Sequence, residues 1–297
     1  MGGERAAIRA ARTGILFRLS PILVPFAALF LGGFVLACAQ SLGFMAPIPL
    51  PGDPWRAYAE VFTDSWFWAS FGFTVYVAAS SALLSVAAGS LFAYGIWKLP
   101  ARWQGSAVVY KVPLVLPHIA VGFVVLILFT QSGFLASAGH SLGLVEGLRD
   151  FPAVLYSGNG LGLILAYTYK GTGFVILMAY AILKRLDPRQ ITMARMLGAG
   201  RLRIYHSVVL PHLAPVLHTC FIILFLYSFG AFDIPFLLSE SYPGMLSIRA
   251  FNLFFRRDLS NRPEAMAILV VMFLFAGLFI ILYTRVVDRL QSGERKL

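Results

Sequence analysis

Six long apolar segments limit what this chain can fold into. A helix needs about 20 predominantly apolar residues to cross the hydrocarbon core of a bilayer, and six segments of roughly that length are separated by polar or Pro- and Gly-rich connections. They cover approximately residues 21–39, 67–97, 112–130, 161–183, 213–237 and 265–286. Only 12% of the residues are charged, against about 25% in soluble domains. The sequence therefore predicts an all-α membrane protein with about six transmembrane helices.

The first apolar segment, 21–39, could be a membrane anchor or the core of a cleaved signal peptide. Four arginines precede it, namely Arg5, Arg9, Arg12 and Arg18, as basic residues also precede a signal peptide. The segment is long enough to span a bilayer, however, and small residues alone do not establish a cleavage site. We therefore predict that it remains as a membrane anchor.

Basic residues are distributed unevenly between alternate connections. The 24 Lys and Arg residues exceed the 13 acidic ones, and such a surplus could mark a nucleic-acid-binding protein. Cytoplasmic loops of membrane proteins carry the same surplus, however. With a cytoplasmic amino terminus, 17 basic residues fall in cytoplasmic segments and six in outer segments, while Lys170 falls within a span. This bias predicts that both termini are cytoplasmic and that nucleic acid is not a partner.

The same topology predicts the organisation of the chain. Residues 1–20 form a cytoplasmic amino-terminal segment, 21–290 a six-helix transmembrane domain, and 291–297 a cytoplasmic tail. The outer segments are longer than simple turns and cover about 40–66, 131–160 and 239–264. They are expected to offer a rim for a soluble partner.

Two kinds of chemistry find no support in the sequence. A Gly-rich phosphate-binding segment with a Lys does not occur, so any nucleotide hydrolysis must come from another polypeptide. The five histidines, His118, His140, His206, His212 and His218, lack the close pairing and the Cys or carboxylate company of a metal site. We predict neither catalytic nor metal-binding residues in this chain.

The connection between the fourth and fifth apolar segments, residues 186–212, is strongly patterned. Pro188 suits the first turn of a helix, and an apolar stripe follows at Ile191, Ala194 and Leu197. Gly198 and Gly200 interrupt it. A second helical stripe then contains Leu202, Tyr205, Val208 and Val209 and ends at Pro211. The pattern predicts two short amphipathic helices that meet at a glycine bend.

This connection resembles the Glu-Ala-Ala loop of ATP-binding cassette importer permeases. In that family, Glu-Ala-Ala is followed after three residues by Gly-Ala, and then by an aromatic residue and Leu-Pro at fixed offsets. The matching residues here are Ala194, Gly198, Ala199, Tyr205, Val208, Leu210 and Pro211. Thr192 and Met193 stand where the family usually has Glu and Ala, which puts any ion pair made by that glutamate in question.

The resemblance implies a type I importer permease fold in the bacterial cytoplasmic (inner) membrane. It implies that the loop 186–212 is a coupling element seated on separate ATPase subunits, which would bind ATP and Mg, so that this chain carries no cofactor. Further implied partners are a second permease chain, identical or related, and an extracytoplasmic solute-binding protein. The coupling residues would be Ala194, Gly198, Ala199, Gly200, Tyr205, Leu210 and Pro211. The alternative is an ordinary loop whose arginines face lipid headgroups.

Three further segments resemble one branch of these permeases. Residues 112–120 (Val-Pro-Leu-Val-Leu-Pro-His-Ile-Ala), 169–171 (Tyr-Lys-Gly) and 229–235 (Phe-Gly-Ala-Phe-Asp-Ile-Pro) are similar to the polyamine, ferric-ion and thiamine branch. Together the similar segments fall within residues 67–286. The implied solute is small and polar or charged, and polyamine-like, ferric-ion or related.

Two charged residues and two prolines are candidates for the translocation pathway. Lys170 and Asp233 lie in apolar segments, where a charge is costly unless it meets a partner or a wet cavity. They could contact the solute or gate the pathway; alternatively, Lys170 could snorkel or pair internally, for example with Asp233, and serve stability. Pro117 and Pro235 interrupt apolar segments and could free carbonyls that line a cavity, although such prolines also occur without a function.

Two other functions remain open at this point. A secondary transporter or channel working alone would need ion-coupling groups and often carries inverted repeats, and the halves show no convincing repeat. A membrane scaffold would use its loop only to hold a partner. Strict dependence of solute uptake on ATP distinguishes the importer permease from both.

Overall fold

The computed structural model describes residues 2–44, 52–147, 150–255 and 258–294. These residues form helices and connections, without a strand among them. Six helical stretches are long and apolar enough to cross a membrane, and they are Arg18–Ser41, Ser65–Lys98, His118–Ser141, Leu161–Leu183, Arg201–Gly230 and Leu259–Arg289. The prediction of an all-α chain with six spans is confirmed.

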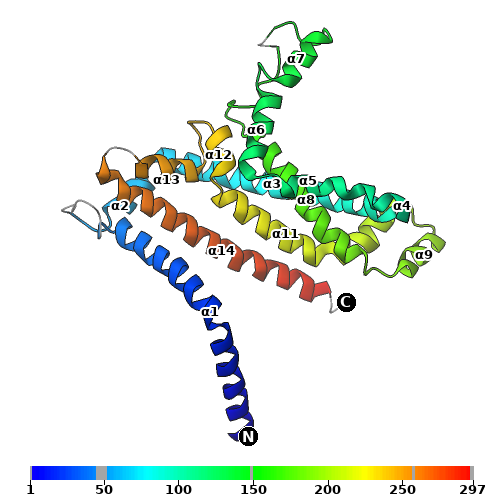
Figure 1. The fold of residues 1–297 in the computed structure, drawn as a ribbon, viewed down its shortest axis with the longest axis horizontal. Coiled ribbons are helices and arrows are strands. Elements are labelled where there is room, and N and C mark those ends of the chain that lie inside the picture. Colours follow the sequence, from blue (N-terminus) through cyan, green and yellow to red (C-terminus); the bar gives the residue numbers. More distant parts are fainter. Residues whose placement is uncertain (1, 45–51, 148–149, 256–257, 295–297) are drawn as a thin grey trace. The chain divides into compact units, whose positions relative to one another are not determined.

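The chain divides into two compact units, which are described separately (Figure 1). Unit 1 comprises Met1–Thr63 and Ala250–Leu274. It contains α1 (Gly2–Ser41), α2 (Arg56–Thr63), the second half of α13 (Leu246–Phe255), the short 3-10 helix η3 (Leu259–Asn261) and the first part of α14 (Arg262–Glu294). The ring of Phe34 packs on that of Phe273, with centroids 4.3 Å apart, and so joins α1 to α14.

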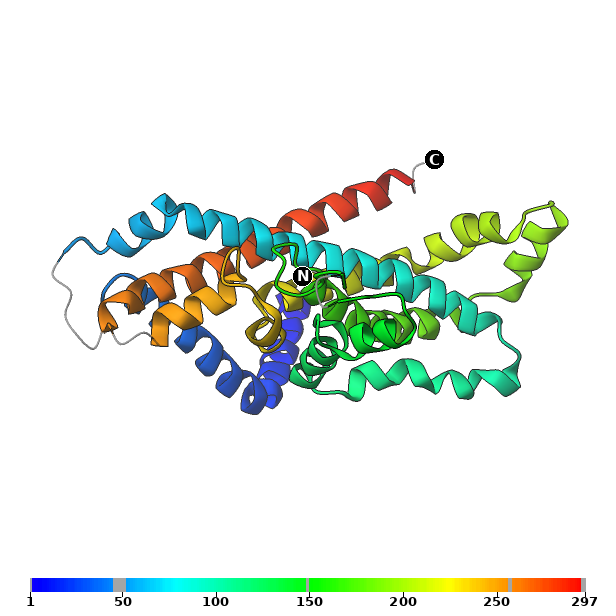
Figure 2. The same ribbon diagram turned by 90° about the horizontal axis from the view of Figure 1, so that it is seen from above.

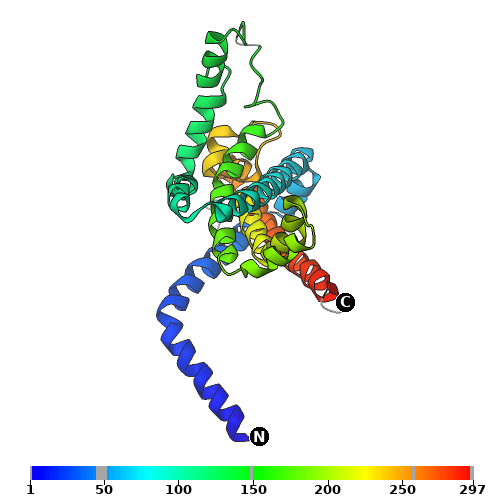
Figure 3. The ribbon, with the colours of Figure 1, turned by 90° about the vertical axis from the view of Figure 1, so that its right-hand side faces the viewer.

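Unit 2 comprises Asp64–Arg249 and Phe275–Leu297. Its long helices are α3 (Ser65–Lys98), α8 (Leu161–Leu183) and α11 (Leu210–Gly230), joined by the last part of α14. The shorter elements are α4 (Ala101–Gln104), η1 (Ser106–Lys111), α5 (Val112–Val115), α6 (His118–Phe129), α7 (Phe134–Ser141), α9 (Pro188–Met196), α10 (Arg201–Ile204), η2 (Tyr205–Val209) and α12 (Asp233–Leu238). Figure 3 shows α6 and α7 extending away from the bundle of α3, α8 and α11.

Small residues allow α3 and α8 to pack closely along their length. A Cβ atom added at Gly89 of α3 would lie 2.5 Å from Cβ of Val175 on α8, and one added at Gly171 of α8 would lie 2.3 Å from Oγ of Ser85 on α3. Close approach of this kind gives membrane helices their van der Waals contact, because lipid supplies no hydrophobic force between them. The two helices form the core of unit 2.

Aromatic side chains join α11 to the last part of α14. The rings of Phe225 and Phe279 stack with centroids 4.0 Å apart, and Phe229 packs on Phe275 at 5.0 Å. The hydroxyl of Tyr283 lies 2.8 Å from Nδ1 of His218, so this contact also satisfies a polar group of each helix. His218 is a packing residue, as the sequence favoured for an isolated histidine.

The third apolar segment, predicted over 112–130 with an interruption at Pro117, is not one continuous helix. It is interrupted at Leu116 and Pro117, where both residues adopt extended conformations between α5 and α6. Pro117 has no N–H to continue the hydrogen bonding of α5, and its ring disfavours a helical conformation of the preceding residue. A hydropathy profile does not detect this interruption, because all the residues involved are apolar.

The fifth span also departs from the prediction. It covers Arg201–Gly230 rather than 213–237, because α10, the π-helical segment η2 and α11 follow one another without a break, and α12 is a separate short helix. Pro211 does not end a helix but occupies the first turn of α11. The wider turn of η2 directly precedes this proline, and π-turns of this kind occur mostly as single insertions within α-helices.

Candidate functional site

The patterned connection forms a projecting arm at one end of unit 2. Helix α9 lies at the same end of unit 2 as the connection that contains α4, as Figures 1 and 2 show. Asp187 caps α9 by accepting a hydrogen bond from the N–H of Arg189 at 2.9 Å, and Pro188 occupies its first turn. The predicted short helix beginning at Pro188 is confirmed.

The predicted glycine bend is present, and the backbone conformation at one of its two positions requires a glycine. Gly198 has φ +78°, a left-handed conformation that an L-residue seldom adopts. Gly200 has φ −69° and precedes α10 in an extended conformation that any residue can take. An added Cβ meets nothing within 4 Å at either position. The bend therefore depends on the backbone freedom of Gly198, and close approach at Gly200 is not required within the described residues.

The arm presents an apolar surface that nothing in the described chain covers. Ile191 is buried and Ala194 half-buried, as the stripe predicted, but Leu197 is 87% exposed because it lies beyond the last turn of α9. The other exposed apolar side chains are Met193, Met196 and Leu202, at 64%, 83% and 71%. Four arginines of the same connection are also exposed, namely Arg189, Arg195, Arg201 and Arg203. Exposed apolar side chains together with charged ones are typical of a protein-binding surface.

Tyr205 fixes the base of the arm to α3. Its side chain is 7% exposed, its hydroxyl lies 2.8 Å from Oγ of Ser90, and its ring packs on Tyr94 at 5.4 Å. Leu210 is half-buried, and the exposed Pro211 lies beside it in the first turn of α11. Tyr205 begins η2, so the π-helical segment lies at the joint between arm and bundle.

Replacing Tyr205 with Phe is expected to destabilise the protein modestly. The ring would keep its packing, and one buried hydrogen bond worth about 1 kcal/mol would be lost. The measurement is the thermal unfolding of the purified protein in detergent. Tyr76→Phe is the control, because Tyr76 also lies on α3 but is 49% exposed. Equal effects of the two substitutions would contradict the role of the Ser90 contact.

A cavity of about 270 Å³ lies within unit 2 beside the break between α5 and α6. Its lining residues come from α3, α5, α6, α8 and α11. Tyr167, Lys170, Gly171 and Phe174 of α8 all line it, because residues three and four apart share one face of a helix. The rings of His118 on α6 and Tyr227 on α11 lie 4.9 Å apart at this cavity.

Lys170 bridges the cavity wall to the break in the third span. Its Nζ donates a hydrogen bond to the carbonyl oxygen of Leu116 at 2.6 Å. That carbonyl immediately precedes Pro117, so the proline and the lysine predicted for the pathway do lie together. Asp233 and Pro235, in contrast, do not line the cavity. Among the described residues, no ion pair joins Lys170 to Asp233, so the predicted alternative of a pair between them is not observed.

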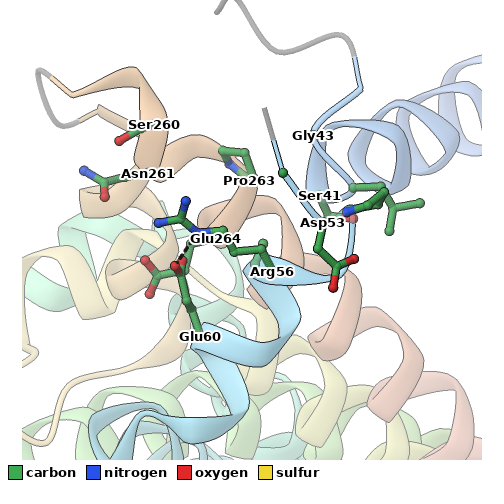
Figure 4. A pocket seen from close by; sticks show the side chains of 13 residues that line it. Ser41, Gly43, Asp53, Arg56, Glu60, Ser260, Asn261, Pro263 and Glu264 are labelled. Carbon is green, nitrogen blue, oxygen red and sulfur yellow. Dashed lines mark hydrogen bonds and ion pairs between the residues drawn. The ribbon is translucent and has the colours of Figure 1, made fainter. Parts of the chain in front are cut away.

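A second cavity, of about 230 Å³, lies in unit 1. Figure 4 shows that Arg56 points toward Glu60 and that Glu264 lies beside them. The Arg56 Nε to Glu60 Oε1 distance is 2.7 Å. This hydrogen bond and the charge of Glu60 raise the pKa of the Arg56 guanidinium. Both side chains are largely exposed, so the pair contributes little to stability. The cavity is lined by residues within 41–60 and 260–264, which belong to two of the predicted rim segments.

The sequence did not identify three of the residues at the larger cavity. Tyr167 and Tyr227 received no role, and His118 was considered only as a metal ligand and rejected. The spacing of Tyr167 and Lys170, three residues apart on one helix, is a signal that could have drawn attention to Tyr167. Nothing local in the sequence connects Tyr227 or His118 to Lys170, because they lie on separate helices.

Two transport permeases are similar in sequence to most of this chain. The sulfate transport system permease protein CysT of Salmonella typhimurium is 26% identical over 275 residues, which are 88% of this chain and 94% of that protein. The molybdenum transport system permease protein ModB of Escherichia coli is 25% identical over 180 residues, 60% of this chain and 74% of that protein. Both are permeases of transport systems.

A solved structure shares the fold. It is that of a bacterial ABC transporter involved in the import of the acidic polysaccharide alginate, with a TM-score of 0.75, 16% identity, and coverage of 96% of this chain and 99% of that one. The sequence of residues 85–293 also matches the binding-protein-dependent transport system inner membrane component family. This match covers more than half of the chain and includes the arm, most of the cavity lining and the last four spans. The chain therefore belongs to this family, the membrane-spanning permease subunits of type I ATP-binding cassette importers.

Proposed function

We propose that this permease subunit forms part of the translocation pathway for a small polar or charged solute, and that the arm around α9 couples it to a separate ATPase. The single observation that carries the coupling role is the exposed apolar surface of the arm. Its members, Met193, Met196, Leu197 and Leu202, are all more than 60% exposed. An ATPase subunit with a complementary apolar cleft would cover them.

The proposed partners follow from this role. The ATPase would hold ATP and Mg, a second permease chain would complete the pathway, and an extracytoplasmic binding protein would deliver the solute. The arm would lie in the cytoplasm together with both termini. With the arm in the cytoplasm, the unit 1 cavity would lie on the binding-protein side, because three predicted crossings separate the connection that contains α2 from the arm. Enzymatic activity would reside in the ATPase alone.

The solute is expected to be charged. The names of the two relatives refer to sulfate and to molybdenum, and Lys170 places a cationic side chain at the wall of the unit 2 cavity. A polyamine-like or ferric solute, the expectation from the branch resemblance, would meet a like charge there.

Replacing Gly198 with Thr is expected to reduce ATP-driven uptake roughly 5- to 30-fold. The left-handed conformation costs an L-residue about 1–2 kcal/mol, and a β-branched residue is especially unsuited to it, so the arm would lose the orientation that the ATPase requires. Uptake is measured in vesicles that contain the complete transporter. The matched control is Gly200→Thr, because Gly200 already has an extended conformation with free space around it.

The same vesicles distinguish the alternative function. Uptake that needs ATP and an ATPase that purifies with the chain support the importer permease. Uptake driven by an ion gradient in the absence of ATP would instead identify a secondary transporter. Equal uptake by the Gly198 and Gly200 variants would remove the coupling role from the bend.

A further inference from the structure

The unit 2 cavity contains a cationic side chain without a carboxylate in direct contact. No Asp or Glu occurs among its described lining residues, and among the described residues no ion pair involves Lys170. Its walls include apolar side chains such as Leu114, Phe174 and Ile223. A charged group within a span is costly unless it faces a partner or a wet cavity. Lys170 is therefore positioned to bind an anion.

Lys170 also retains the means to bind one. The ammonium group has three N–H donors, and one of them is directed to the carbonyl oxygen of Leu116 at 2.6 Å. This bond holds the end of the side chain at the break between α5 and α6 and so preorganises it. The remaining N–H groups can serve a ligand in the cavity.

Tyr167 supplies an independent observation. Its side chain lies one turn before Lys170 on α8 and lines the same cavity. The residue is only 3% exposed, and its hydroxyl has no hydrogen-bond partner within the part of the chain that the structure describes. A buried polar group without a partner is uncommon, because it forfeits its bonds to water. An acceptor oxygen in the cavity would satisfy this hydroxyl.

Helix α6 adds a third favourable element. It begins at the cavity wall with His118, directly after Pro117. The first N–H groups of a helix have no acceptor within it, and the aligned peptide dipoles make this end positive. Helix starts within interrupted spans favour anionic groups in transporters. With twelve residues, α6 is long enough to have this property.

We propose that this cavity binds a small oxyanion, with the ammonium group of Lys170 and the hydroxyl of Tyr167 donating to its oxygens and the start of α6 contributing positive potential. The inference rests on the proposed function, because it names the solute class of that pathway. A cationic solute would face the charge of Lys170 without a carboxylate in the lining to offset it. The site would thus select for the sign of charge within the membrane, separately from the binding protein.

The test is binding of radiolabelled sulfate to the complete transporter complex in lipid nanodiscs, without the binding protein. Equilibrium dialysis at low ionic strength gives the dissociation constant, with molybdate and oxalate as anionic competitors and spermidine as a cationic one. Lys170→Gln removes the charge but keeps a donor for the Leu116 carbonyl, and Tyr167→Phe removes only the hydroxyl. Lys184→Gln is the control, because Lys184 also belongs to the α8 region, lies over the ring of Tyr180 and does not line the cavity.

Saturable sulfate binding that anions displace and spermidine does not is the expected result. Lys170→Gln should weaken it roughly 10- to 100-fold and Tyr167→Phe about 5-fold, as expected for charged and neutral hydrogen bonds, while Lys184→Gln leaves it unchanged. No saturable binding of sulfate, molybdate or oxalate, or equal binding by the Lys170 variant, would overturn the inference.

ATP-driven uptake by the same complex, reconstituted into vesicles with its binding protein, tests the proposed function separately. Normal ATP-driven uptake together with absent anion binding rejects the oxyanion site and leaves the permease role standing. Saturable anion binding by a chain that purifies without an ATPase and takes up nothing with ATP rejects the proposed function and leaves the anion site standing.

Discussion

Replacing Met196 with Asp is expected to detach the ATPase from the complex and to abolish ATP-driven uptake. Met196 is 83% exposed at the end of α9, so the substitution should leave the fold of the permease intact. Burial of a Met side chain contributes about 1.5–3 kcal/mol, and an unpaired carboxylate at the same place adds a desolvation cost. The combined effect predicts at least a roughly 100-fold weaker association.

The measurement is the amount of ATPase that purifies with the tagged permease in mild detergent. Leu142→Asp serves as the control, because Leu142 is similarly exposed, at 75%, but follows α7 in the connection after the third span. The control should retain the ATPase in full. A Met196→Asp permease that retains its ATPase and its uptake would show that the arm is not the docking element.

Replacing Gly89 with Val is expected to destabilise the protein strongly. The new Cβ would lie 2.5 Å from Cβ of Val175 and 3.2 Å from the carbonyl oxygen of Thr172. The second of these atoms belongs to the backbone and cannot move by a rotamer change, so α3 and α8 would have to separate. Overpacking typically costs about 1–3 kcal/mol and sometimes more, which corresponds to a fall of roughly 5–10 °C in unfolding temperature.

Thermal unfolding of the detergent-purified protein checks this expectation, with Gly95→Val as the matched control. Gly95 also lies on α3, but an added Cβ there meets nothing within 4 Å. The control should unfold at nearly the temperature of the unchanged protein. If both variants unfold at the same lowered temperature, the loss of stability reflects the introduction of Val into α3 rather than the contact of position 89 with α8.

Hydropathy predicted the spans well where local sequence signals, such as a glycine or a basic residue, mark their ends. The fourth span, Leu161–Leu183, has the predicted limits at both ends. Gly160, in a left-handed conformation, precedes it, and the basic Lys184 follows it. These signals are local, so the sequence alone contains them.

The two spans predicted less well contain prolines whose effect depends on their surroundings. Pro117, which was considered as an interruption of an apolar segment, breaks a helix, whereas Pro211, which was predicted to end one, does not. At Pro117 the freed carbonyl of Leu116 obtains a hydrogen bond from Lys170, 54 positions along the chain. At Pro211 the helix is continuous through η2. Both outcomes depend on the local backbone hydrogen bonding, which hydropathy does not encode.

The arm could be predicted from the sequence more completely than the cavity, again because its signals are local. The arm lies within one stretch of chain, so its short helix, its bend at Gly198 and its buried Tyr205 could be predicted. The cavity assembles Tyr167, His118 and Tyr227 from three helices, and only the charge of Lys170 marked it in advance. Asp233 carried the same signal but is exposed and outside the cavity lining.

The tight contact between α3 and α8 has a mechanical consequence. With 34 residues, α3 is about 50 Å long, and the contacts at Gly89 and Gly171 leave little room for it to slide or tilt against α8. The two helices would therefore move as a single rigid lever, and Tyr205 fixes the arm to one of them through Ser90. A push on the arm would be delivered along this lever to the wall of the cavity at Tyr167 and Lys170, without any hinge in between to absorb it.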